Sequence, residues 1–278
     1  MTSRKALTLL VVLAAAVVVF AATRYSRAVM ADLGESSPGG ASATARATLS
    51  FFRNPATVPA FPARDLDGRE VSTGKWRGKV VLVNFWATWC GPCRAEIPDL
   101  VALQEKYRDQ LQIIGVSEDE APPEEVKRFA VEHKMNYPVV MTTAEIRQIF
   151  PGVSALPTSF ILDRESRLVQ KHVGMLKASM TELEARALAG LPVAAEIEEV
   201  DQAQGLKLGD GAQAIDIPGV DLARLDVAKR TKALQKLNSQ PCTCGCDLTV
   251  ARCRVDDPTC SVSLPLAKQI VQQVIDER

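Results

Sequence analysis

Two cysteines that directly follow a buried strand constrain the fold of this chain more than any other feature. Lys79–Trp86 is an apolar run rich in β-branched residues, which is typical of a central strand buried on both faces. It is followed by Trp89-Cys90-Gly91-Pro92-Cys93, in which Pro92 fits the first turn of a helix, where its missing N–H costs nothing. The sequence therefore predicts a strand that delivers Cys90 to the edge of a sheet and to the start of a helix.

The start of that helix favours thiol chemistry at Cys90. Unpaired backbone N–H groups and the positive end of the helix dipole stabilise a thiolate relative to the thiol. A Cys-x-x-Cys pair can instead be half of a zinc site, but the only histidines, His133 and His172, lie far away and no second Cys-x-x-Cys exists. We therefore predict that Cys90 and Cys93 form a redox-active disulfide.

Residues 81–98 carry a family resemblance: Val-Leu-Val-Asn-Phe-Trp-Ala-Thr-Trp-Cys-Gly-Pro-Cys-Arg-Ala-Glu-Ile-Pro resembles the membrane-tethered thioredoxins of bacterial envelopes, the TlpA and ResA type. The resemblance extends from about Pro59 to Leu191 and implies an α/β thioredoxin-like fold, a central mixed sheet flanked by helices, that needs no cofactor. Further elements follow in the expected order: hairpins over 63–72 and 160–174, strands over 112–116 and 137–141, and helices over 123–134 and 179–191.

The resemblance also implies a surface that binds substrate. Leu156 and Pro157 fall where thioredoxins carry a cis-proline loop that faces the cysteine pair. Together with Trp89 and Pro92, this loop is expected to form an apolar platform on which the backbone of a substrate protein docks.

Proton transfer to and from Cys93 needs a titratable group. Asn84 stands where thioredoxin has a buried aspartate, and an amide cannot titrate. Glu96 lies three residues after Cys93, hence on the same side of the helix, and ResA-like proteins carry a glutamate there. We predict that Glu96 is a catalytic acid and base. The alternative is a solvated carboxylate that the helix dipole favours.

The N-terminal residues predict attachment to a membrane. After Arg4-Lys5 the chain is apolar from Ala6 to Ala22 apart from Thr8, a stretch of 17 residues. No small-x-small cleavage site is evident, which favours an uncleaved signal anchor over residues 1–23 with a cytoplasmic amino terminus. We predict a single-pass protein of a bacterial inner membrane with its catalytic domain in the periplasm or another extracytoplasmic space; the alternative is secretion after cleavage.

The remaining residues divide into two linkers and two folded regions. We predict a flexible linker over 24–58, the thioredoxin-like domain over 59–191, a second linker over 192–219 and a helical, Cys-rich module over 220–278. With 33 basic and 33 acidic residues the chain has no net charge, and nothing recommends nucleic acid as a partner.

Five of the seven cysteines lie in the last region, with the spacing C-x-C-x-C-x6-C-x6-C: Cys242, Cys244, Cys246, Cys253 and Cys260. Leucines between 222 and 237 predict an amphipathic helix before them, and Ser263-Leu264-Pro265 begins another after them. A module of about 60 residues needs a staple or a partner to be stable. Three interpretations stay open: disulfides, a site for Cu(I), zinc or an iron–sulfur cluster, and a redox relay with Cys90 and Cys93.

The predicted function is that of an extracytoplasmic thiol–disulfide oxidoreductase, which reduces disulfides in secreted proteins such as apocytochrome c. The Gly-Pro pair between the cysteines is that of thioredoxin and favours a reductant. The resemblance implies a transmembrane thiol reductant of the DsbD or CcdA kind as electron donor. The alternative is a protein that handles copper or zinc, in which the thioredoxin-like domain keeps the tail cysteines reduced.

Overall fold

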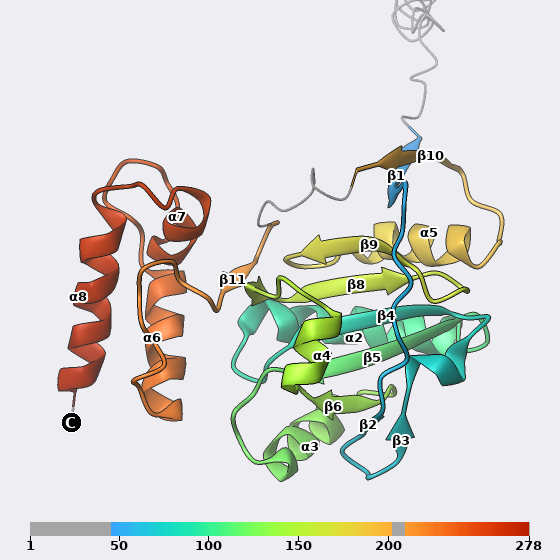
Figure 1. Cartoon of the computed structure of the whole chain (residues 1–278), viewed down its shortest axis with the longest axis horizontal. Helices are drawn as coiled ribbons and strands as arrows, with labels where there is room; N and C mark the ends of the chain where they lie inside the picture. The colour runs from blue at the N-terminus through green and yellow to red at the C-terminus, as the bar shows by residue number, and fades with distance from the viewer. Residues whose placement is uncertain (1–45, 202–208, 278) are drawn as a thin grey trace, which may run out of the picture. The chain divides into compact units, whose positions relative to one another are not determined.

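A five-stranded mixed sheet, in the order β6-β5-β4-β8-β9, lies at the centre of the computed structural model, which describes residues 46–201 and 209–277 (Figure 1). Strands β4, β5 and β6 are parallel, while β8 is antiparallel to both of its neighbours. All residues of β4 are buried, as its apolar β-branched sequence predicts. The strands are β4 (Val80–Trp86), β5 (Leu111–Ser117), β6 (Val139–Met141), β8 (Thr158–Leu162) and β9 (Leu168–Val173).

Helices and a short hairpin complete the thioredoxin-like α/β fold, which confirms the predicted fold class. The helices α2 and α5 pack side by side, and the Tyr107 hydroxyl on the first donates a hydrogen bond of 2.6 Å to Glu182 on the second. The predicted turn at Asp67-Gly68 is present, with Gly68 at a φ of 79°. These elements are β2 (Ala63–Arg64), β3 (Glu70–Val71), the 3-10 helix η1 (Thr73–Trp76), α2 (Gly91–Lys106), α3 (Pro123–Glu132), α4 (Ala144–Ile149) and α5 (Ala178–Leu188).

A separate pair of parallel strands joins two segments that the sequence predicts to be linkers. Strand β1 (Ala47–Phe52) pairs over its whole length with β10 (Ala195–Val200). The linker predictions, 24–58 and 192–219, were therefore wrong for these residues. The physical reason is that Leu49, Phe51 and Phe52 of β1 are buried in the thioredoxin-like core, which an unstructured tether cannot achieve.

The C-terminal residues form a helical module, here called the tail module (residues 220–277), around a second hydrophobic cluster that also includes Ala214 and Ile217. Its helices are α6 (Val227–Ser239), α7 (Val250–Asp256) and α8 (Ser263–Asp276). The first helix begins later than the leucine pattern predicts, because the Asp226 side chain caps it by accepting a 2.8 Å hydrogen bond from the Lys229 N–H. Leu222 and Leu225 precede the helix but are still buried in the cluster.

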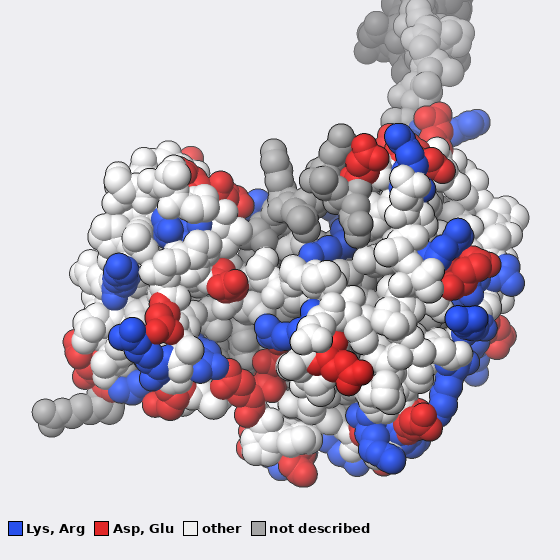
Figure 2. Space-filling view, viewed as in Figure 1, with Lys and Arg blue, Asp and Glu red and all other residues white. Residues whose placement is uncertain are grey.

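The predicted signal anchor, residues 1–23, lies outside the described residues, as does most of the first linker. Among the helices that the structure describes, none combines the length and the apolar character needed to cross a bilayer. On the face shown in Figure 2, basic and acidic side chains are interspersed. This face therefore offers no single-sign field that would steer a charged partner.

Candidate functional site

Cys90 and Cys93 lie where the sequence places them, at the junction between β4 and α2, and they form a disulfide. Cys90 is the N-cap residue of α2, and its Sγ accepts a hydrogen bond from the Cys93 N–H at 3.3 Å. Neither side chain is exposed to solvent. The sulfur of Cys90 is thus held against a free N–H group of a helix start, the arrangement that stabilises a thiolate.

The loop that leads to Cys90 is anchored by an acidic residue that sequence reasoning missed. The backbone N–H and the hydroxyl of Thr88 donate hydrogen bonds of 2.9 and 2.6 Å to the Asp119 carboxylate. Asp119 lies two residues after the end of β5, at the same edge of the sheet as the loop. An acidic residue just beyond a buried parallel strand was the signal that could have identified it.

The Leu156–Pro157 peptide bond is cis, as the resemblance leads us to expect. Pro157 joins β7 (Ala155–Leu156) to β8, and Thr158 pairs with Phe85 of β4. The proline loop and the cysteine loop therefore emerge at the same edge of the sheet.

Glu96 is buried on α2, with 3% of its surface exposed. Its carboxyl oxygens accept hydrogen bonds from two donors. The Asn84 side-chain amide donates to Oε1 at 2.8 Å, and the Leu176 N–H donates to Oε2 at 3.0 Å. The same amide group of Asn84 also lies 3.0 Å from the Ser159 hydroxyl. The residue that replaces the aspartate of thioredoxin thus positions the carboxyl group of Glu96.

Burial raises the pKa of Glu96 to about 7, although the hydrogen bonds from Leu176 and Asn84 act in the opposite direction. Glu96 also lines a pocket of about 220 Å³ between α2 and α5, together with Asp99, Lys106 and Glu182. The alternative of a solvated surface carboxylate is therefore wrong. A carboxyl group with this pKa is suited to exchanging a proton near neutral pH.

Comparisons with known proteins agree with this geometry. A model of the AhpC/TSA family matches residues 56–171. The thioredoxin-like protein YneN of Bacillus subtilis is 36% identical over 121 residues, which are 43% of this chain and 71% of that protein. The thiol-disulfide oxidoreductase ResA of Bacillus thuringiensis is 36% identical over 119 residues, which are 42% of this chain and 68% of that protein.

The chain belongs to the ResA-like family of thiol–disulfide oxidoreductases. It is therefore a redox enzyme. Cys90 and Cys93, here joined as a disulfide, are its redox-active cysteines, and we call them the dithiol pair. A thiol:disulfide interchange protein of Chlorobium tepidum, known from its crystal structure, is 30% identical; the match covers 49% of this chain and 98% of that chain with a TM-score of 0.47. The AhpC/TSA match ends before the tail module begins.

In this ResA-like enzyme a segment that the sequence predicts to be a linker pairs with the strand that directly precedes the cis proline. We call Gly209–Ile217 the covering segment. Its strand β11 (Gln213–Ala214) pairs antiparallel with β7, immediately before the cis proline, and the Ile215 N–H donates to the Ser154 carbonyl at 2.9 Å. Trp89 packs against the core of the thioredoxin-like domain and against the cluster of the tail module. These contacts bring the tail module to the platform predicted for substrates.

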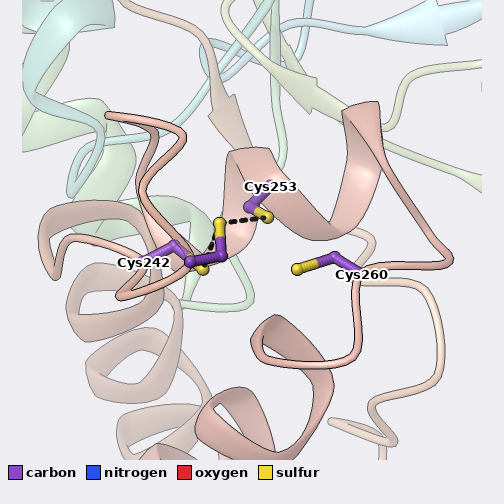
Figure 3. A group of neighbouring side chains, drawn as sticks. Cys242, Cys253 and Cys260 are labelled. Atoms are coloured by element: carbon purple, nitrogen blue, oxygen red, sulfur yellow. Dashed lines mark hydrogen bonds between the residues drawn. The ribbon is translucent and has the colours of Figure 1, made fainter.

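Four of the five tail cysteines form a group that the spacing alone did not identify. The sulfur atoms of Cys242, Cys244, Cys253 and Cys260 all lie within 4.8 Å of one another (Figure 3). Cys246 is outside this group, although its sulfur lies 2.8 Å from that of Cys244. All five are free thiols, and hydrogen bonds from the Ser263 hydroxyl and from the N–H groups of Ser263 and Val262 lower the pKa of Cys260 to about 6.

Proposed function

We propose that this enzyme works outside the cytoplasm as a reductant of disulfides in secreted proteins, for which apocytochrome c is an example. The observation that carries the proposal is the contact between the Cys90 sulfur and the Cys93 N–H at the start of α2. It stabilises the thiolate that attacks a disulfide, as in the thiol proteins of this fold. ResA-like relatives support the same class of reaction.

The reaction is a pair of exchanges that moves two electrons to the substrate. The Cys90 thiolate attacks one sulfur of the substrate disulfide, forms a mixed disulfide and expels the other sulfur as a thiolate. Cys93 then attacks the Cys90 sulfur, which expels the second substrate thiolate and leaves the Cys90–Cys93 disulfide. In the structure this oxidised state is the one present.

Glu96 takes the proton of Cys93 in the second exchange. Its place three residues along α2 and its pKa of about 7 support this role, since close to half of the molecules then carry the basic form near neutral pH. The pocket between α2 and α5, which Glu96 lines, is the proposed route by which the proton returns to solvent. Leu156, Pro157, Trp89 and Pro92 form the platform on which the substrate docks.

The proposed location is the outer face of a bacterial inner membrane, with residues 1–23 as an uncleaved anchor. The apolar run from Ala6 to Ala22 and its flanking basic residues support this location. A transmembrane thiol reductant of the DsbD or CcdA kind would return the pair to its dithiol form.

Thiol labelling of intact spheroplasts tests location and direction together. The probe is a membrane-impermeant maleimide, applied until labelling is complete to cells that express the chain with its five tail cysteines replaced by serine. We expect Cys90 to be labelled without lysis, because the pair is external and held reduced. Labelling only after lysis would contradict the location, and labelling only after added dithiothreitol would contradict the role of reductant.

A second candidate function is the handling of copper or zinc, in which the dithiol pair keeps the tail cysteines reduced. The group of four thiols within 4.8 Å favours it. In this case the first client of Cys90 and Cys93 is the tail of the same chain.

A further inference from the structure

The four grouped thiols have the spacing of a tetrahedral metal site. The sulfur of Cys244 lies 3.4 Å from that of Cys242 and 3.8 Å from that of Cys253. In a tetrahedron with zinc–sulfur bonds of about 2.3 Å, neighbouring sulfurs lie roughly 3.8 Å apart. We propose that Cys242, Cys244, Cys253 and Cys260 bind one Zn(II) ion that staples the tail module. This inference does not depend on the direction in which the dithiol pair works.

The donor set selects a single soft ion. Four thiolates without histidine suit Cu(I), zinc or an iron–sulfur cluster, and of these zinc is the ion that takes four thiolates in a tetrahedron. Because the four sulfurs lie no more than 4.8 Å apart, they enclose one ion and leave no room for the additional irons and sulfides of a cluster. Cys246 contacts the sulfur of Cys244 but does not belong to the group of four, and we assign it no ligand role, which accounts for the odd number of tail cysteines.

The positions of the ligands explain why such an ion would stabilise the module. Cys242 and Cys244 follow α6, Cys253 belongs to α7, and Cys260 precedes α8, so one ion ties all three helices together (Figure 3). A module of this size buries too little apolar surface to be secure without a staple. Binding releases the protons of the thiols, and the free energy of binding adds directly to that of folding.

The surroundings of Cys260 fit a thiolate ligand. The N–H groups of Val262 and Ser263 at the start of α8 and the Ser263 hydroxyl donate to its sulfur. The buried guanidinium group of Arg254 lies 3.4 Å from that hydroxyl and brings positive charge close to the site. Donors and a cation of this kind offset the negative charge of a site with four thiolates.

Metal analysis of the full chain, purified anaerobically and incubated with Zn(II) alone, tests the site. We expect one zinc per chain in the wild type and in Cys246→Ser, the matched control, and less than about 0.2 in Cys253→Ser. Because Cys253 is buried, its replacement could unfold the module. Zinc is therefore also removed from the wild type with a chelator. Helix content measured by circular dichroism should fall on stripping and return when zinc is restored.

Two outcomes would overturn the zinc site. One is a chain whose five tail cysteines are all titratable thiols and that binds no zinc under these conditions. The other is a chain purified anaerobically whose four grouped cysteines are linked as disulfides. Neither outcome touches the proposed role of the dithiol pair, which is measured separately.

A different observation concerns access to the dithiol pair. The covering segment is held at two points: the Gly209 N–H donates to the Val173 carbonyl at 2.7 Å, and the Ile215 N–H to the Ser154 carbonyl at 2.9 Å. Between them, the Asn238 side chain of α6 makes two hydrogen bonds of 2.8 Å with the backbone of Ala214. The covering segment is therefore fixed to the thioredoxin-like domain and to the tail module alike.

The edge that β11 occupies is the one an extended substrate would need. Addition of a strand to an exposed sheet edge is a common way to bind an unfolded peptide. Because β11 already pairs with Ala155 and Leu156 before the cis proline, that edge is taken, and both sulfurs of the pair are buried. We infer that the covering segment competes with protein substrates, which must displace it before Cys90 can attack.

Alkylation of reduced Cys90 by iodoacetamide, followed by mass spectrometry of its peptide, measures this competition. Asn238→Ala removes two hydrogen bonds of the covering segment, and Gly209→Ala places a Cβ 2.3 Å from the Val173 carbonyl oxygen. Asn238→Ala should raise the alkylation rate about tenfold, since two net hydrogen bonds are worth roughly that factor. Gly209→Ala should also raise it, because the clash with the Val173 carbonyl displaces the covering segment. Gln235→Ala, exposed on the same helix, is the matched control and should leave the rate unchanged.

Unchanged rates in both variants, with circular dichroism showing an intact fold, would overturn the inference. A rise in both variants but not in the control would support it. Because alkylation needs no substrate protein, this result is independent of what the enzyme reduces.

Discussion

Replacing Cys90 with serine is expected to abolish the reduction of protein disulfides, for example of insulin followed by turbidity. The Cys90 sulfur accepts a hydrogen bond from the Cys93 N–H at the start of α2, which stabilises its thiolate. A serine hydroxyl in the same place stays protonated and cannot begin the exchange. We expect activity to fall by at least about 1000-fold, since only a thiolate is a competent nucleophile here. Cys246→Ser, which removes an exposed thiol of the tail module, is the control and should keep full activity.

Cys93→Ser should behave differently from Cys90→Ser, although it also loses turnover. Without the second thiol the first exchange still occurs, so the mixed disulfide between Cys90 and the substrate accumulates and is visible on a non-reducing gel. Appreciable turnover by Cys90→Ser, or a trapped complex through Cys93 instead, would refute the assignment of the two roles.

Replacing Glu96 with glutamine is expected to remove a large pH dependence of stability and to slow the second exchange. The pKa of Glu96 is raised by burial from 4.5 to about 7, so the folded protein favours the neutral carboxyl group. The neutral carboxyl group makes its full contribution to stability at pH values below 4.5, its ordinary pKa. That contribution is lost as the pH rises through the folded-state pKa of about 7. A shift of this size corresponds to about 3 kcal/mol in the free energy of unfolding.

Urea unfolding at pH 4.5 and pH 8 measures the effect. Relative to Glu96→Gln, the wild type should lose roughly 3 kcal/mol between these two values. The new amide fits the site if the Asn84 side chain turns over, because its oxygen can then accept from the amide. Glu105→Gln, exposed on the same helix, is the control.

The second exchange should slow by about 100-fold in Glu96→Gln, the usual range for loss of a positioned acid or base. Rapid-mixing experiments that follow the decay of the mixed disulfide at several pH values measure the rate of the second exchange. A rate profile with an unchanged pH dependence would leave Glu96 as a structural residue without a part in proton transfer.

The centre of the fold could be predicted from the sequence because its signals are local. The buried strand, the proline at the first helical turn and the Asp67-Gly68 turn each specify their own neighbourhood. The pair β1–β10 could not be predicted in the same way. Its two strands are separated by more than 140 residues, and the sequence around either strand does not indicate which strand it pairs with.

In the candidate site, too, features set by local sequence could be predicted, whereas features set by tertiary packing could not. Helical spacing was enough to select Glu96, but its burial and its two donors, Asn84 and the Leu176 N–H, depend on how α2 packs in the tertiary fold. The tail cysteines show the same limit. Their spacing left three interpretations open, because only the positions of α7 and α8 decide which four sulfurs meet.

The parallel pairing of β1 with β10 sets how the domain resists mechanical load. Because β1 and β10 run parallel, a pull on Ala47 directed along the axis of β1 would load the hydrogen bonds of the pair together, in shear. In an antiparallel hairpin pulled from its open end, the bonds would instead break one after another. The burial of Leu49 and Phe51 adds to this resistance, because sliding β1 would drag both side chains out of the core. For load applied in this direction, the β1–β10 pair would thus act as a mechanical clamp on the redox domain.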